Sequence, residues 1–134
     1  MLLTKASEYA LLSLIMIAQK ETPQDVDTLS TQLDISKSFL AKILQSLAKE
    51  GIVKSFKGAH GGFMLARDPS ELSLKQIIEC AEKKPATVLE CSQDSNCCPN
   101  HRADFCKIWP FLNKLQSKID DFLDNMSLKD IMSN

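Results

Sequence analysis

Residues 52–66 read IVKSFKGAHGGFMLA, and this stretch decides the fold of the chain. It contains two short runs with the composition of β-strands, residues 52–56 and 63–66, on either side of a turn with three glycines. Such runs around a glycine-containing turn predict a β-hairpin. Because glycine has no side chain, the backbone at the tip of the hairpin can approach another surface closely. The stretch therefore predicts a two-stranded wing.

Groups that carry or can acquire a positive charge flank the tip of this wing. A hairpin that serves only the fold has no need of basic groups at both its mouth and its tip. Such groups suit a polyanionic surface such as DNA. The candidate binding residues of the wing are Lys57, His60, Gly61 and Arg67.

The residues before the wing predict two helices joined by a tight turn. The first is short, can be capped by Asp25 or Asp27, and ends before a connection at residues 34–36. The second spans residues 36–50 with apolar side chains at three- and four-residue spacing, and Gly51 ends it as a left-handed cap.

Two helices with a short turn between them are typical of a helix-turn-helix, although any three-helix bundle can show the same pattern. In a helix-turn-helix the second helix enters the major groove of DNA with its N-terminal residues. Hydroxyl and ammonium groups there can donate to phosphate oxygens. The candidate residues of this helix are Ser36, Lys37, Ser38 and Lys42.

The positive charge of the chain is concentrated in the same part, while the net charge of the whole chain is −1. Residues 36–67 contain six Lys or Arg and a single acidic residue, Glu50. Residues 68–134 contain eight basic and eleven acidic residues. A locally basic segment in a neutral protein fits a DNA-facing surface, and an ordinary solvated helix face accounts for it about as well.

No stretch of the sequence predicts a membrane span or a signal peptide. The apolar run at residues 10–18 is too short to cross a bilayer and is followed by polar residues without a cleavage site. We therefore expect a cytoplasmic protein. In that compartment clustered cysteines bind metal or carry out redox chemistry more often than they form structural disulfides.

Four of the five cysteines lie within sixteen residues, at Cys91, Cys97, Cys98 and Cys106. An irregular loop can gather such thiolates around one point, whereas a helix or a strand would direct them apart. The spacing therefore predicts a metal or iron-sulfur site in this loop. The fifth cysteine, Cys80, lies near the apolar face of a helix capped by Ser73, and we expect it to be a small packed side chain.

Two longer helices are predicted at the ends of the chain. The first covers residues 2–20, and an acidic residue in its first turn, Glu8, has dipole compensation as its ordinary role. The second follows the cysteine loop and carries a continuous apolar stripe from Ile108 to Met126. A solitary stripe of this length needs a partner, and the simplest partner is the same helix of a second chain.

These elements predict a mainly α chain with a small β-hairpin. We expect a winged helix-turn-helix domain at residues 1–84, a cysteine-rich sensor loop at residues 85–106, and a dimerisation helix with a short final helix at residues 107–134.

This combination resembles the bacterial winged-helix regulators that include the iron-sulfur regulator IscR and the nitric-oxide-sensing repressor NsrR. The likeness covers nearly the whole chain. The motifs that carry it are Leu3-Thr4 with Tyr9-Ala10, SKSFL at residues 36–40, GAHGGFMLA at residues 58–66 and FLDNMSL at residues 122–128.

The resemblance implies that three cysteines of the loop hold a 2Fe-2S or 4Fe-4S cluster. They would be Cys91, Cys106 and either Cys97 or Cys98, of which Cys97 fits the family spacing better. The histidine ligand of IscR-like members corresponds here to Trp109 and is therefore absent.

The fourth ligand that the resemblance implies is Glu8, because NsrR-like relatives use an acidic residue of the first helix, donated by the other subunit. His101 and the spare cysteine are the alternatives. A carboxylate binds iron more weakly than a thiolate does, so this corner would be the exchangeable one.

The leading hypothesis is a homodimeric regulator that binds promoter DNA and senses iron-sulfur status, redox state or nitric oxide through the cluster. A second hypothesis keeps DNA binding but replaces the cluster by disulfide formation among the loop cysteines. A third, a small zinc or redox enzyme, is disfavoured because the loop has no Cys-x-x-Cys pair and no evident substrate pocket. We therefore expect a protein that is not an enzyme.

Overall fold

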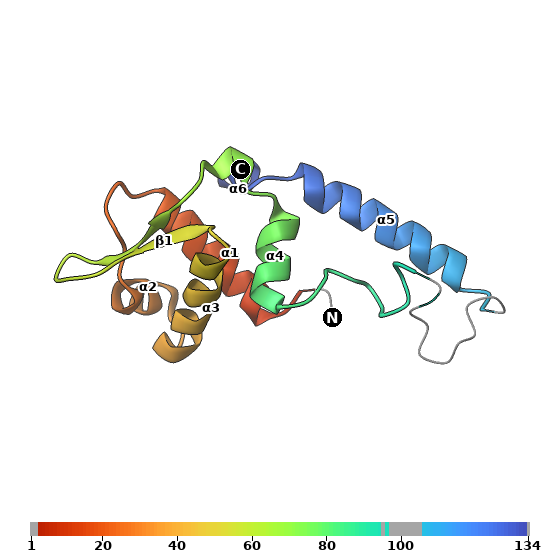
Figure 1. Ribbon diagram of the computed structural model, residues 1–134, viewed down its shortest axis with the longest axis horizontal. Helices are drawn as coiled ribbons and strands as arrows, with labels where there is room; N and C mark the ends of the chain where they lie inside the picture. The colour runs from red at the N-terminus through yellow and green to blue at the C-terminus, as the bar shows by residue number, and fades with distance from the viewer. Residues whose placement is uncertain (1–2, 95, 97–105, 134) are drawn as a thin grey trace.

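The computed structural model describes residues 3–94, 96 and 106–133. Its described elements are mainly helical, with one antiparallel sheet of two strands, as the sequence predicts (Figure 1). In chain order they are α1 (Lys5–Ala18), α2 (Val26–Leu33), α3 (Lys37–Lys49), β1 (Val53–Phe56), β2 (Gly62–Leu65), the 3₁₀ helix η1 (Pro69–Glu71), α4 (Leu74–Glu82), α5 (Trp109–Asn125) and α6 (Leu128–Met132).

Short polar side chains fix where most of the helices begin. Each accepts a hydrogen bond from a backbone N–H group in the first turn, which would otherwise have no partner in the helix. Of the two aspartates that could cap α2, Asp25 is the one that does so, and its carboxylate accepts from the N–H of Thr28. The other capping side chains are those of Thr4, Ser36, Ser73 and Ser127.

The wing is the hairpin of β1 and β2, with Val53 opposite Leu65 and Phe56 opposite Gly62. Gly61 closes the turn by donating its N–H to the carbonyl of Gly58 at 3.0 Å. A Cβ atom on Gly61 would collide with the backbone carbonyl of Phe56. Gly61 is therefore required by the shape of the turn, whatever contact the tip makes.

The core lies where α1, α3 and α4 pack against one another. Fully buried side chains from all three helices meet there, among them Leu14, Leu44 and Ile77. Burial of a leucine or isoleucine side chain contributes about 1.5–3 kcal/mol to folding. The helix that would read DNA is therefore held rigidly by its inner face.

The C-terminal part of the chain extends away from this core and then returns to it. In Figure 1 the helix-turn-helix and the wing lie at one end of the molecule, and the start of α5 lies at the other end. The chain rejoins the core after α5, where Leu74 donates its N–H to Met126 and Leu128 donates to Leu72, at 2.8 and 2.9 Å. None of the described helices has the length and hydropathy needed to cross a membrane.

Candidate functional site

The connection between α2 and α3 has the geometry of a helix-turn-helix. α2 ends at Asp34, which adopts a left-handed conformation with φ 54° and ψ 50°. The next residue, Ile35, is buried and anchors the turn in the core. Only residues 34–36 separate the end of α2 from the start of α3. The start of α3 is therefore fixed relative to α2.

The start of α3 presents all four predicted DNA-contacting residues to solvent, namely Ser36, Lys37, Ser38 and Lys42. The hydroxyl of Ser36 is already engaged, because it caps α3 by accepting the N–H of Phe39 at 3.4 Å. The ammonium of Lys37 lies 2.7 Å from the carboxylate of Asp27 on α2, and this hydrogen bond raises the pKa of Lys37.

The four predicted residues of the wing take up different positions. Lys57 and His60 are exposed near the tip, where Gly61 shapes the turn. Arg67 lies beyond β2, and its guanidinium donates to the carbonyl of Glu71 at 3.0 Å and to the side chain of Gln76 at 3.3 Å. Arg67 therefore holds η1 and α4 at the base of the wing.

A hollow of about 420 Å³ separates the start of α3 from the start of α1. Tyr9 of α1 meets Phe39 of α3 there edge to face, with ring centroids 5.6 Å apart. Lys5 lies over the ring of Tyr9 at 5.9 Å and adds a further cation beside Lys42. Sequence reasoning missed Lys5 as a member of this surface, because its proximity to α3 depends on how α1 packs.

Of the cysteine loop, the structure describes the two ends. Cys91 and Cys106 are half-buried, and the described cysteines form no disulfide with one another. Cys97, Cys98 and His101 lie outside the described residues. Within the described part of the chain, no group of three or more His, Cys, Asp or Glu side chains surrounds a common point.

A hydrogen bond joins the two ends of the loop. The indole N–H of Trp109, three residues after Cys106, donates to the carbonyl of Cys91 at 2.7 Å. The loop that carries the four thiols is therefore closed at its base. Cys91 and Cys106 bring soft sulfur donors, the kind that iron-sulfur clusters take, to the two ends of this loop.

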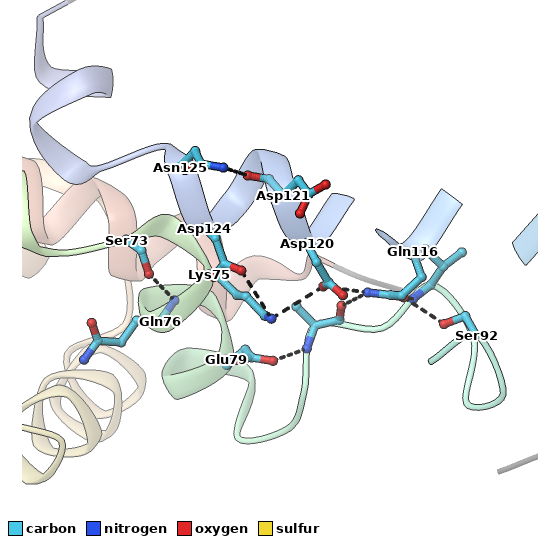
Figure 2. Close-up of polar contacts among 12 residues, drawn as sticks. Ser73, Lys75, Gln76, Glu79, Ser92, Gln116, Asp120, Asp121, Asp124 and Asn125 are labelled. Atoms are coloured by element: carbon cyan, nitrogen blue, oxygen red, sulfur yellow. Dashed lines mark hydrogen bonds and ion pairs between the residues drawn. The ribbon is translucent and has the colours of Figure 1, made fainter. Parts of the chain in front are cut away.

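The residues just after Cys91 are bound by the next turns of α5. The side-chain amide of Asn113 donates to the carbonyls of Ser92 and Gln93 at 2.9 and 3.3 Å. Gln116 accepts from the hydroxyl of Ser92 at 2.7 Å, as Figure 2 shows. Sequence reasoning missed these residues, although a glutamine in place of an apolar residue on the stripe of a helix was a possible signal.

Glu8 lies on the exposed first turn of α1. Its carboxylate forms an ion pair with Lys5 at 2.8 Å, and half of its side chain is accessible. It borders a largely apolar hollow of about 340 Å³ with Leu3 and Leu11 among its lining residues. In Figure 1 the start of α1 lies near the middle of the molecule and the start of α5 at its far end. Within one protomer, the start of α1 is therefore well separated from the start of α5.

Cys80 is a half-buried thiol between α3 and α4, as expected for a packed side chain. Its Sγ atom lies 3.3 Å from the carbonyl of Ser46. Burial, with a smaller contribution from Glu50, raises the pKa of Cys80. The thiolate form is therefore disfavoured, and Cys80 is a poor candidate for a reactive or metal-binding thiol.

Comparison with known families now decides the class of the protein. Residues 3–134 match the Rrf2 family, described as iron-dependent transcriptional regulators. The chain belongs to the Rrf2 family. The resemblance drawn from the sequence motifs is thereby confirmed.

The similarity of this Rrf2 chain to individual proteins extends over almost its whole length. It is 31% identical to an HTH-type transcriptional regulator of Aquifex aeolicus over 99% of this chain and 92% of that protein. It is 30% identical to the regulator NsrR of Bacillus licheniformis over the whole chain and 94% of that protein. Among solved structures it is similar to CymR, the global cysteine regulator of B. subtilis, with a TM-score of 0.73 and 26% identity over 98% and 95% of the two chains.

These matches confirm the winged-helix fold class and identify the chain as a DNA-binding transcription regulator of the Rrf2 family. They do not concern the individual site residues. Trp109 is informative here, because an indole has a donor N–H but no acceptor nitrogen for a metal. At the position where the resemblance to IscR-like members places a histidine, this chain therefore carries a group that donates to the backbone carbonyl of Cys91.

Proposed function

We propose that this protein is a homodimeric Rrf2 regulator whose affinity for promoter DNA depends on an iron-sulfur cluster held by Cys91, Cys97 and Cys106. The observation that carries the proposal is the closed base of the cysteine loop, where Trp109 binds the carbonyl of Cys91 at 2.7 Å. The family description as iron-dependent regulators supports the same cofactor. The alternative third thiol is Cys98.

We propose Glu8 of the partner protomer as the fourth ligand, with His101 or the spare cysteine as alternatives. Glu8 is exposed, and the first turn of α1 is well separated from the start of α5 in the same chain, so in this proposal a second chain brings Glu8 to the cluster. Release of its ion pair with Lys5 would free the carboxylate for this role. Since both protomers then contribute to one site, gain or loss of the cluster acts directly on the contact between them.

DNA contact in this proposal comes from the start of α3 and from the tip of the wing. Lys37, Lys42, Lys57 and His60 are the exposed groups, and each can approach a phosphate. Ser38 is exposed beside them, Ser36 fixes the start of the helix, and Gly61 fixes the shape of the tip. Arg67 supports the base of the wing. Two such surfaces on a two-fold dimer would face successive turns of one DNA duplex.

The cluster, when bound, supplies a group that reacts with oxidants and nitric oxide, so the protein would have a cluster-bound and a cluster-free state. A ligand shifts a conformational equilibrium only if it binds the two states differently. The contribution of Glu8 across the dimer would provide this difference. If the cluster-bound state fits DNA better, loss of the cluster weakens DNA binding. If the cluster-free state fits better, loss of the cluster strengthens it.

The experiment is iron and sulfide counting on protein purified without oxygen, for wild type, Cys91→Ser and Glu8→Ala. We expect a cluster in wild type, none in Cys91→Ser, and a cluster that is lost faster in Glu8→Ala. Metal-free Glu8→Ala should bind DNA like the metal-free wild type. Wild-type protein without iron would overturn the proposal, and an unchanged cluster lifetime in Glu8→Ala would remove Glu8 from the ligand set.

Thiol oxidation without a cluster is the second candidate. It is favoured by the similarity to CymR, the global cysteine regulator of B. subtilis. In that case the loop thiols of Cys91, Cys97, Cys98 and Cys106 would form disulfides on oxidation. Colourless protein whose DNA affinity changes reversibly with a thiol reductant would establish this alternative.

A further inference from the structure

We propose that three polar residues on one face of α5, Trp109, Asn113 and Gln116, are positioning residues that hold Cys91 in place for the cluster. This inference rests on the proposed function and adds to it the residues that fix one thiol ligand. The three residues are spaced by four and three positions, so they lie one above another on the helix. We call them the α5 polar stripe.

The α5 polar stripe binds three consecutive residues of the loop. Trp109 donates to the carbonyl of Cys91, and Asn113 donates to the carbonyls of Ser92 and Gln93. Gln116 then accepts from the Ser92 hydroxyl. These bonds hold the carbonyl of Cys91 and the two residues that follow it. They therefore fix the direction of the Cα–Cβ bond of Cys91.

Gln116 is the most constrained member of the stripe. It is 2% exposed, and its side-chain amide makes four hydrogen bonds. Its oxygen accepts from the N–H of Val88 and the hydroxyl of Ser92, both at 2.7 Å. Its nitrogen donates to the carbonyl of Ala86 at 2.8 Å and to Asp120 at 2.9 Å. A primary amide has two donors and one acceptor oxygen with two lone pairs, so every position is used.

The position of Ser92 is equally well defined, because its side chain is fully buried. Its hydroxyl donates to Gln116 and contacts the backbone of Leu89. A buried polar network that is completely satisfied favours a single conformation, since any displacement leaves a polar group without a partner. The residue next to Cys91 therefore has one preferred position.

The network continues from the loop to the core of the DNA-binding part. Asp120, which receives a hydrogen bond from Gln116, lies 3.6 Å from the ammonium of Lys75 on α4 (Figure 2). α4 packs against both α1 and α3. The position of Cys91 is thus defined relative to α4 and is not left to the loop.

Outer-shell partners orient metal ligands, and their removal typically weakens metal binding about 10–100-fold. The α5 polar stripe acts through the backbone of the ligand residue and has the same consequence. A misplaced Cys91 would bind the cluster with poorer geometry, so the cluster would be lost sooner.

The test compares Asn113→Ala with Asn125→Ala, and adds Trp109→Phe. Asn125 is a matched control, because it also lies on α5 and its side-chain amide donates to a backbone carbonyl, that of Asp121, at 2.7 Å. Trp109→Phe keeps an aromatic ring and removes the N–H group. Cluster loss to a chelator is followed by visible absorbance, with visible circular dichroism as a signature of cluster geometry.

We expect about tenfold faster cluster loss and an altered dichroism spectrum for Asn113→Ala and Trp109→Phe. Asn125→Ala should behave like wild type in both measurements. In metal-free protein, amide hydrogen exchange in the peptide around Cys91 should rise for the two stripe variants alone.

Equal cluster lifetimes in all variants would overturn this inference and leave the proposed function standing. Unchanged hydrogen exchange around Cys91 in the stripe variants would also overturn it, because the stripe then does not hold the loop. Wild-type protein that carries no iron would instead overturn the proposed function itself.

Discussion

Glu82 shows how one residue of α4 secures the beginning of α1. Its carboxylate accepts from the N–H and the hydroxyl of Thr4, and from the N–H and the hydroxyl of Ser7. These donors belong to the cap and the first turn of the helix, where a negative charge also stabilises the helix dipole. The ordinary role that the sequence assigned to Glu8 is therefore performed by Glu82, a residue 74 positions later in the chain.

Stability should depend on pH through Glu82. Partial burial alone would raise the pKa of Glu82, but the hydrogen bonds from Ser7 and Thr4 hold it below its usual value. Its stabilising contribution is therefore present above the unfolded-state pKa of about 4.3, and is lost as the pH falls through the lower pKa of the folded state. We expect Glu82→Gln to lower the free energy of unfolding at pH 7 by about 1–2 kcal/mol.

Urea denaturation of wild type and Glu82→Gln at neutral and at acid pH measures this effect. The difference between the two proteins should shrink below about pH 4. The control is Glu21→Gln. Glu21 is exposed and follows the C-terminal end of α1, so its substitution should change the free energy of unfolding little at either pH. A difference that persists unchanged at acid pH would contradict the assignment.

Lys37 and Asp27 give a pair of predictions with opposite signs. Lys37→Ala should weaken binding to specific and unrelated DNA alike. It should also reduce the slope of log affinity against log salt concentration by about one, the value for one phosphate contact.

Asp27→Asn should strengthen binding, because it removes an anion and frees Lys37 from the ion pair. Fluorescence anisotropy at several salt concentrations measures both. A salt dependence that Lys37→Ala leaves unchanged would exclude Lys37 from the DNA interface.

At the scale of elements, α5 has two apolar faces with different roles. Leu112 and Leu123 are buried on the face that includes Gln116. Phe111 and Phe122 lie on the other face and are 62% and 61% exposed. Phe122 also borders a nearly apolar hollow of about 310 Å³ beside Leu3. The exposed face is the surface that we propose for dimerisation.

Phe122→Lys should therefore convert the proposed dimer to a monomer. A central aromatic residue of an interface typically contributes about 2 kcal/mol or more to association, which is about thirtyfold in the dissociation constant. The protomer should remain folded, because the side chain is mostly exposed in it, while the melting temperature falls because the folded state loses its partner. Sedimentation velocity measures the oligomeric state. The control is Phe56→Lys on the wing, which should leave the dimer intact, and a dimer that persists in Phe122→Lys would place the interface elsewhere.

The sequence predicts the elements of this fold well, because their signals are local. Ser36 and Ser73 cap helices where the sequence places them, and Gly51 adopts the expected positive φ of 77°. The remaining parts of the candidate site depend on tertiary contacts. Gln116 binds Ser92, 24 positions away, and Glu82 binds Ser7, 75 positions away, and no local pattern identifies such partners.

At the scale of the whole molecule, the start of α5 and the helix-turn-helix with its wing lie at opposite ends (Figure 1). The described connection between them runs through α5 and α4, because Lys75 lies 3.6 Å from Asp120 and 3.8 Å from Asp124. α4 in turn packs on α3. In the function that we propose, a change at the cysteine loop would reach the reader through these helices within one protomer and through Glu8 across the dimer.

The most direct test of this coupling is the DNA affinity of one anaerobic preparation before and after its iron is removed by a chelator, at fixed salt concentration. A coupling free energy of about 1–3 kcal/mol corresponds to a change of roughly 5–150-fold in the dissociation constant. We expect a change of at least about fivefold that reverses when the cluster is rebuilt. Identical affinities of the iron-loaded and the iron-free protein would contradict a cluster that controls DNA binding.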